Sequence, residues 1–168
     1  ISGCLRAILL GTLISIFHMN NGIITIQKSC LKGQVKVSGA KNSALRLLAA
    51  SLLTNEDVEL LNFPNGLLDI QVHIEMLKVL GKEYYQNFSS IKISEKTNHV
   101  KTGLDWNGRS IRNTLLILGA LTTRFGEGRV PLPGGCNLGD RKYDIHNMLL
   151  KKMGAKVWEE QGYLCTKV

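Results

Sequence analysis

The fold is decided by the stretch 58–94, which reads VELLNFPNGLLDIQVHIEMLKVLGKEYYQNFSSIKIS. Its middle part has the apolar spacing and length of a helix, and Gly81 follows as the residue that commonly ends one. Apolar runs of four to five residues flank this helix, with Pro64-Asn65-Gly66 as turn residues before it. The predicted order is a strand (58–62), a turn (64–66), a helix (Leu68–Leu80) and two strands (83–87 and 90–94).

The same order of elements recurs later in the chain. Val130 is the counterpart of Val58, and Gly154 is the counterpart of Gly81. A repeat of this length indicates repeated α/β units that must pack on one another to complete a core. The second copy is predicted as a helix (Ile111–Arg124), a strand (Arg129–Leu132), a glycine loop, a helix near Asp144–Met153 and two strands (Lys156–Glu160 and Tyr163–Lys167).

The residues before this stretch predict a hairpin and the helix that opens the first copy. The runs 22–27 and 34–38 favour two paired strands, and Ser43–Leu53 has the composition of a helix capped by Asn42 or Ser43. Between the two copies, the polar stretch 95–109 is predicted to be a connection. The organisation is therefore two α/β units preceded by a hairpin.

The composition is that of a folded protein with anionic partners. Of the 168 residues, 44% are hydrophobic and 20% are charged, and the net charge is +8. Such an excess of positive charge favours nucleotides, phosphate esters, nucleic acids or acidic lipids. Aromatic residues make up only 6% of the chain and do not alternate with Lys or Arg in a run. This argues against a base-stacking surface, so no nucleic-acid partner is expected.

The four cysteines and the N-terminus bear on the compartment. Cys4, Cys30, Cys136 and Cys165 are widely and irregularly spaced, which argues against a zinc or dithiol site and favours reduced thiols in the cytosol. The apolar run 5–17 is too short for a confident membrane span. We expect Ile1–His18 to be extraneous to the fold, with a signal or anchor segment as the alternative, and we expect no membrane partner.

A glycine-rich loop carries the most reactive side chain. Residues 131–141 read PLPGGCNLGDR, which places Cys136 between glycines and five positions before Arg141. Nearby positive charge lowers the pKa of a thiol and makes it useful in catalysis. The alternative is a buried cysteine beside an ordinary turn, which is the more usual place for a free thiol.

Basic residues lie at three predicted helix starts, where cations are unfavourable unless an anion compensates. They are Lys41 before the first helix, Arg112 in the first turn of another, and Arg141 before the last. Helix starts bind phosphate and carboxylate, so the set predicts an anion site, although each residue alone fits a solvated surface charge. By contrast, His73, His146 and Cys165 are predicted to be packing residues, His146 less clearly.

These residues resemble the enolpyruvyl transferases. The resemblance rests on the motifs VSGAKNSAL (37–45), LAASLL (48–53), RFG (124–126) and PGGC (133–136), and on Arg112, Leu118-Gly119, Gly139, Arg141, Asp144 and His146. It implies an α/β fold of six βαβαββ units in two domains, of which this chain holds about the first two. Ile1–His18 has no counterpart. Residues 19–40 would form a hairpin that packs on the missing second domain, and residues 41–168 a partial catalytic domain.

The resemblance also implies the activity and the residues that carry it. Within this family, the motifs are most similar to those of the enzyme that transfers the enolpyruvyl group of phosphoenolpyruvate to the 3′-hydroxyl of UDP-N-acetylglucosamine. This reaction is the first committed step of peptidoglycan synthesis. Cys136 would be the general acid and the target of fosfomycin. Lys41 and Asn42 would bind phosphoenolpyruvate. The UDP-sugar would be bound by Arg112, Arg141, Lys142, Tyr143, Asp144 and Ile145. No metal or cofactor is expected.

Three alternatives stay open at this point. Arg46, Asn113 and Lys142 depart from the family pattern, which allows another nucleotide sugar as substrate. A non-catalytic basic module for anions or nucleic acid is a second possibility. The shikimate-pathway enzyme of the same fold is a third, although it does not rely on a cysteine in this loop. Because the second-domain acid and arginines of the family have no counterpart here, we expect the chain alone to be inactive.

Overall fold

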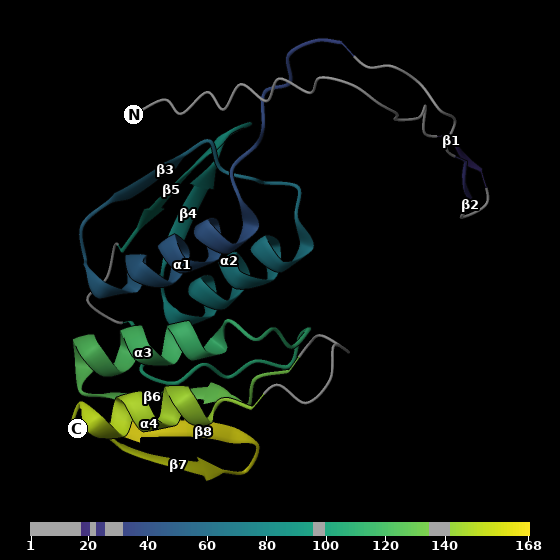
Figure 1. Cartoon of the computed structure of the whole chain (residues 1–168). Coiled ribbons are helices and arrows are strands. Elements are labelled where there is room, and N and C mark those ends of the chain that lie inside the picture. Colours follow the sequence, from purple (N-terminus) through teal and green to yellow (C-terminus); the bar gives the residue numbers. More distant parts are fainter. Residues whose placement is uncertain (1–17, 21–22, 26–31, 96–99, 135–141) are drawn as a thin grey trace. The chain divides into compact units, whose positions relative to one another are not determined.

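The computed structural model describes residues 18–20, 23–25, 32–95, 100–134 and 142–168. The chain divides into two compact units, residues 1–38 and residues 39–168 (Figure 1). In the first unit, strands β1 (His18–Asn20) and β2 (Ile23–Thr25) pair in antiparallel register. The predicted pairing of β2 with 34–38 is wrong, because 34–38 forms no strand. In sequence, only Asn21-Gly22 separates β1 from β2, and this dipeptide strongly favours a tight hairpin.

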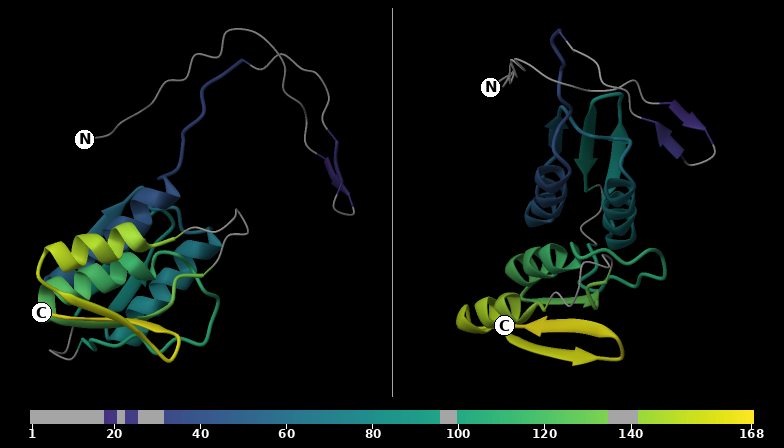
Figure 2. Two further views of the ribbon diagram at one scale, coloured as in Figure 1. Left: turned by 60° about the horizontal axis from the view of Figure 1, so that its bottom comes forward. Right: turned by 45° about the vertical axis from the view of Figure 1, so that its right-hand side comes forward.

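The second unit contains two copies of one arrangement (Figures 1 and 2). The first copy consists of α1 (Lys41–Ala50), the 3₁₀ helix η1 (Ser51–Leu53), β3 (Val58–Leu61), α2 (Leu68–Leu80), β4 (Glu83–Gln86) and β5 (Ser90–Ser94). The second consists of α3 (Thr114–Phe125), β6 (Glu127–Pro131), α4 (Asp144–Lys152), β7 (Lys156–Glu160) and β8 (Tyr163–Lys167). The strand orders, β3-β5-β4 and β6-β8-β7, correspond, so the predicted repeat is confirmed.

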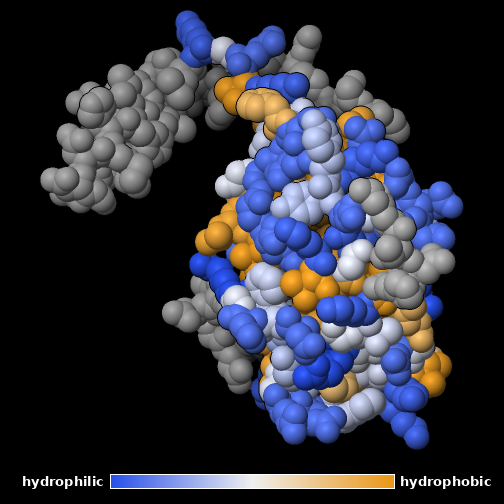
Figure 3. Space-filling view, turned by 180° about the vertical axis from the view of Figure 1, so that it is seen from behind, coloured by the Kyte–Doolittle hydropathy of each residue, from blue (hydrophilic) through white to orange (hydrophobic). Residues whose placement is uncertain are grey.

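The two helices of each copy lie against one face of its sheet, and the copies share a continuous core (Figure 2). Leu48 of α1, Ile74 of α2 and Ile93 of β5 are almost fully buried in the first copy. Leu118 of α3 and Leu164 of β8 play the same part in the second. The face seen in Figure 3 is mostly hydrophilic, with hydrophobic residues in small separate patches.

Glycines end the helices where the sequence predicts. Gly81 after α2 and Gly154 after α4 take left-handed backbone angles, with φ of 108° and 98°. These angles are strained for other residues, which explains why the helices end there. Between β7 and β8, Gln161 and Gly162 also have positive φ, as a two-residue hairpin turn requires.

Two helix starts differ from the prediction. Helix α1 begins at Lys41 after Ala40, which makes no side-chain cap, so neither Asn42 nor Ser43 is the cap. Helix α3 begins only at Thr114, so Arg112 lies before the helix and not in its first turn. The helix start was predicted too early because Ile111 has the apolar character of a core residue. It is buried (4% exposed) but lies outside the helix.

The polar stretch between the copies is not a plain solvated connection. Leu104 is fully buried, and the 102–104 backbone lies parallel to β6, where Leu104 N–H donates to Arg129 O (2.8 Å). The side chain of Glu95 is only 2% exposed and forms ion pairs with Lys82 and Arg124. The described part of this stretch, 95 and 100–109, contains no helix or strand and is a connection as predicted, but the side chains of Glu95 and Leu104 within it are buried.

Candidate functional site

Several described residues of the predicted site lie in the first turns of helices. All four helices begin on the same side of the unit, at the right in Figure 1. Lys41 and Asn42 form the first turn of α1, and Asp144 and Ile145 that of α4. The unpaired N–H groups and positive dipole ends of the helices therefore face the same side, which favours an anion there.

Lys41 connects the first two helix starts. Its Nζ lies 2.9 Å from Asp69 Oδ2, and the two side chains are 46% and 30% exposed. Asp69 belongs to the first turn of α2. Sequence reasoning missed Asp69, although an acid in the first turn of a helix is a recognisable signal. Asn42 has an exposed side chain, and its carbonyl accepts a hydrogen bond from Arg46 Nη1 (3.0 Å).

The segment 110–112 contacts the chain on both sides of the cysteine loop. Arg112 Nη2 donates to the carbonyl oxygen of Lys142 at 2.7 Å. On the other side of the loop, Gly134 lies so close to Ser110 that an added Cβ would overlap the serine side chain. Gly134 is therefore needed because the two segments approach closely. Cys136 and Arg141 themselves lie outside the described residues, so their convergence with Lys41 and Arg112 stays a prediction.

Tyr143 fixes the start of α4 to the sheet. Its hydroxyl donates to Glu159 Oε1 on β7 at 2.6 Å, and its ring packs against the core. The hydrogen bond to this carboxylate raises the pKa of Tyr143. Glu159 was not predicted, because nothing in the sequence relates it to a residue sixteen positions away. Asp144 and Ile145 are exposed, Ile145 by 68% of its surface.

The side chains predicted to pack are confirmed in two of three cases. His73 in α2 is fully buried, neither ring nitrogen has a hydrogen-bond partner, and burial lowers its pKa to about 4. Cys165 in β8 is also buried, and burial raises the pKa of its thiol. His146 in α4 is exposed instead of core-facing.

An apolar groove opens between α1, α3 and α4. Its volume is about 300 Å³, and its lining includes Leu53, Leu115, Gly119 and Leu149, with Arg46 and His146 as the ionisable residues. Among the described residues, no group of three or more His, Cys, Asp or Glu could hold a metal. In the same part of the chain, no helix is both long and apolar enough to span a membrane.

Comparison with known proteins gives the family of the chain. Residues 26–168 match the EPSP synthase (3-phosphoshikimate 1-carboxyvinyltransferase) family. A relative from Carboxydothermus hydrogenoformans, named UDP-N-acetylglucosamine 1-carboxyvinyltransferase 1, is 44% identical over 80% of this chain and 31% of its own length. The enzyme of that name from Hamiltonella defensa is 43% identical over 85% of the chain and 34% of its own length. The chain thus spans about a third of these curated relatives.

A solved structure has the same fold. The enolpyruvyl transferase NikO from Streptomyces tendae superimposes with a TM-score of 0.61, over 78% of this chain and 28% of its own. At 19% identity, this likeness concerns the fold alone. The family match covers most of the chain, and the duplicated units agree with it. The chain belongs to the EPSP synthase family of enolpyruvyl transferases.

Proposed function

We propose that this chain forms the N-terminal part of an enzyme that transfers the enolpyruvyl group from phosphoenolpyruvate to the 3′-hydroxyl of UDP-N-acetylglucosamine. Relatives named UDP-N-acetylglucosamine 1-carboxyvinyltransferase, at 43–44% identity, support this substrate pair over the shikimate-pathway reaction. The presence of Cys136 in the glycine loop supports it too. The enzyme would act in the cytoplasm, in peptidoglycan synthesis, and would thereby serve cell-wall growth, cell shape and division.

The proposed chemistry begins with a proton transfer to carbon. Cys136 gives a proton to the methylene carbon of phosphoenolpyruvate, and the sugar hydroxyl then adds to the neighbouring carbon. Positive charge develops on that carbon, so preorganised polar groups stabilise the step. The hydroxyl proton goes to a carboxylate, acting as general base, in the part of the enzyme that lies outside this chain. Phosphate then leaves, and the new methyl group loses a proton to the Cys136 thiolate, which re-forms the carbon–carbon double bond and gives the enolpyruvyl ether.

The remaining predicted residues would bind the substrates. Lys41 and Asn42 would hold phosphoenolpyruvate at the start of α1, where the helix dipole adds to the charge of the lysine. Arg112, Arg141 and the residues Lys142, Tyr143, Asp144 and Ile145 would line the UDP-sugar site. The observation that carries the proposal is the contact of Arg112 with Lys142, which joins two of these predicted segments at the helix starts.

A hybrid protein tests the proposal. It consists of residues 19–168 followed by the part of the Carboxydothermus hydrogenoformans relative beyond the matched region. We expect fosfomycin to add one equivalent to Cys136, with Cys30 and Cys165 unmodified in the same peptide map. A hybrid in which fosfomycin modifies another cysteine, or none, would count against the assignment of Cys136. The purified 168-residue chain, tested in parallel, should not turn over the two substrates.

The same hybrid decides between nucleotide sugars. Lys142 and Asn113 depart from the family pattern at the predicted sugar site, and Lys142 is exposed. With phosphoenolpyruvate fixed, phosphate release is compared for UDP-N-acetylglucosamine and for UDP-sugars that differ at the N-acetyl group. Faster phosphate release with another UDP-sugar would contradict UDP-N-acetylglucosamine as the acceptor, although it would still agree with enolpyruvyl transfer.

A further inference from the structure

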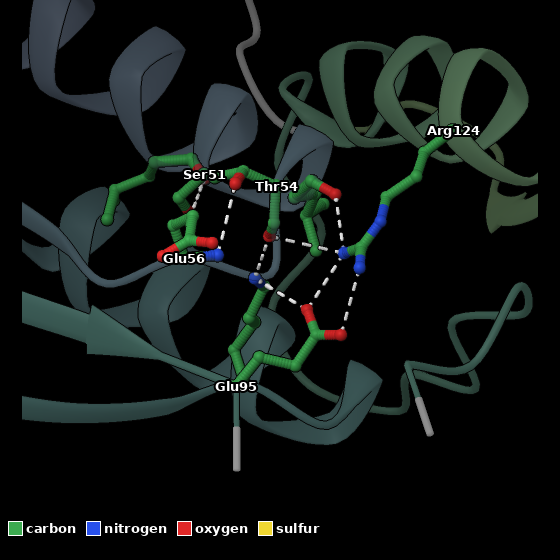
Figure 4. A network of polar contacts seen from close by, with 8 residues as sticks. Ser51, Thr54, Glu56, Glu95 and Arg124 are labelled. Carbon is green, nitrogen blue, oxygen red and sulfur yellow. Dashed lines mark hydrogen bonds and ion pairs between the residues drawn. The ribbon is translucent and has the colours of Figure 1, made fainter. Parts of the chain in front are cut away.

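A buried charge network joins the two copies of the repeat (Figure 4). Glu95 follows β5 of the first copy, and its carboxylate lies between Lys82 and Arg124. Arg124 binds it with two nitrogens, Nη1 to Oε2 at 2.8 Å and Nη2 to Oε1 at 2.9 Å. Lys82 Nζ lies 2.7 Å from Oε2. The side chains of Lys82 and Glu95 are 1% and 2% exposed and that of Arg124 is 19% exposed, so water screens the Lys82–Glu95 pair little and the Arg124 end of the network more.

The network also binds the backbone that follows α1. Arg124 Nη1 donates to the carbonyl oxygens of Leu52 (3.0 Å) and Thr54 (3.2 Å). Lys82 Nζ donates to the same Thr54 carbonyl at 2.6 Å. Arg124 comes from the end of α3, in the second copy, whereas its partners all belong to the first. One side chain therefore connects α3 to the end of η1 and to the segment after β5.

The charges of the network do not cancel among themselves. Two cations face one carboxylate, and the excess positive charge points at carbonyls at the C-terminal end of the α1–η1 segment. Such an end carries partial negative charge, which compensates a cation. Burying three ions costs desolvation energy, so a network of this kind adds little net stability compared with apolar packing. Removing one partner is costly, however, because it leaves buried charge without compensation.

We propose that this network couples the two copies of the repeat into one cooperative folding unit by fixing α3 against the α1–η1 segment. The network determines that α3 packs against the α1–η1 segment, and it adds little to the free energy of unfolding. Without it, the two copies still pack through Leu52 and Leu118 but open separately. Trp106 and Trp158, the two tryptophans of the chain, both follow Glu95 in the sequence and report on the second copy.

The experiment compares the unfolding of the two copies in the 168-residue chain. Urea unfolding is followed by tryptophan fluorescence for the second copy, and by hydrogen exchange of α2 and β5 amides for the first. In the unmodified chain the two transitions should have the same midpoint. In the triple variant Lys82→Met/Glu95→Leu/Arg124→Met, which leaves no buried charge, the midpoints should separate. In Glu95→Gln, both copies should unfold at lower urea.

A matched control removes an ion pair that does not join the copies. Asp105→Asn breaks the pair between Arg129 Nη1 and Asp105 Oδ1 (2.6 Å), whose side chains are 41% and 74% exposed. Its two midpoints should stay equal. Separate midpoints in the unmodified chain, or equal midpoints in the triple variant, would overturn the proposal. If Glu95→Gln fails to fold, the comparison of the two midpoints in the unmodified chain and in the triple variant still tests the proposal.

Discussion

His73 shows how strongly burial changes a single residue. The imidazole is fully buried in α2, neither of its nitrogens has a partner, and its pKa falls to about 4. An unfolded histidine titrates near pH 6.5, so the unfolded chain takes up a proton between pH 6.5 and 4 that the folded chain does not. The free energy of unfolding should therefore decrease as the pH falls through this range, by up to about 3 kcal/mol.

The His73→Leu variant isolates this effect. A buried polar ring without hydrogen bonds is unfavourable, so the variant should be at least as stable as the unmodified chain at pH 7. Urea unfolding at several pH values should show a smaller slope of stability between pH 6.5 and 4. An unchanged slope would mean that His73 does not carry the acid sensitivity.

Gly39 is predicted to be irreplaceable for a different reason. An added Cβ at this position would overlap the carbonyl of Asn62, which follows β3. Gly39→Ala should therefore destabilise the fold by about 1–3 kcal/mol through overpacking. Gly119 in α3 is the matched control, since an added Cβ there meets nothing within 4 Å. Gly119→Ala should stabilise the chain by about 0.5–1 kcal/mol, and thermal unfolding measures both.

At the scale of elements, a pair of threonines connects α3 to the second sheet. Thr122 Oγ1 and Thr166 Oγ1 of β8 lie 2.5 Å apart, and both side chains are buried. Thr122→Val and Thr166→Val should each cost about 1 kcal/mol, and the double variant should cost less than their sum because the groups are bonded. Thr123→Val, on the exposed side of α3, should change little. Strict additivity in urea unfolding would contradict the coupling.

The sequence predicts some elements well and others poorly, for physical reasons. Helix α2 and strands β5, β7 and β8 have the predicted bounds, since apolar periodicity and turn glycines define them locally. The start of α3 is wrong because Ile111 continues the apolar pattern as a buried residue outside the helix. The predicted strand pairing of β2 is wrong because β2 pairs with β1, as the two-residue turn sequence Asn21-Gly22 between them favours.

In the candidate site, too, features with a local sequence signal are predictable, and features that depend on distant residues are not. The place of Lys41 and of Asp144 at helix starts is predictable because polar and basic residues at helix starts form a local pattern, whereas their role in binding stays a prediction. Asp69 and Glu159 were not found, since each acts through a partner far away in sequence. The burial of Glu95 is not predictable from sequence, because a single acid at the start of a polar connection gains its partners Lys82 and Arg124 only in the folded chain.

At the scale of the whole molecule, the chain holds two repeats of a longer architecture. It spans about a third of its curated relatives, and its two sheets repeat one strand order. The α4 side chains Met148 and Leu149 are more than half exposed, at 51% and 56%, and Leu149 lines the apolar groove. The predicted catalytic role of Cys136 is therefore tested in a hybrid that adds the rest of a relative's length.

The most direct measurement is turnover by the hybrid protein. With phosphoenolpyruvate and UDP-N-acetylglucosamine, it should release phosphate and form the enolpyruvyl ether of the sugar, identified by its mass. Cys136→Ser in the same hybrid should lower the rate by about 10²-fold or more, as the loss of a general acid predicts. A folded hybrid that forms no enolpyruvyl ether, or one in which Cys136→Ser leaves the rate unchanged, would contradict the proposed transferase chemistry.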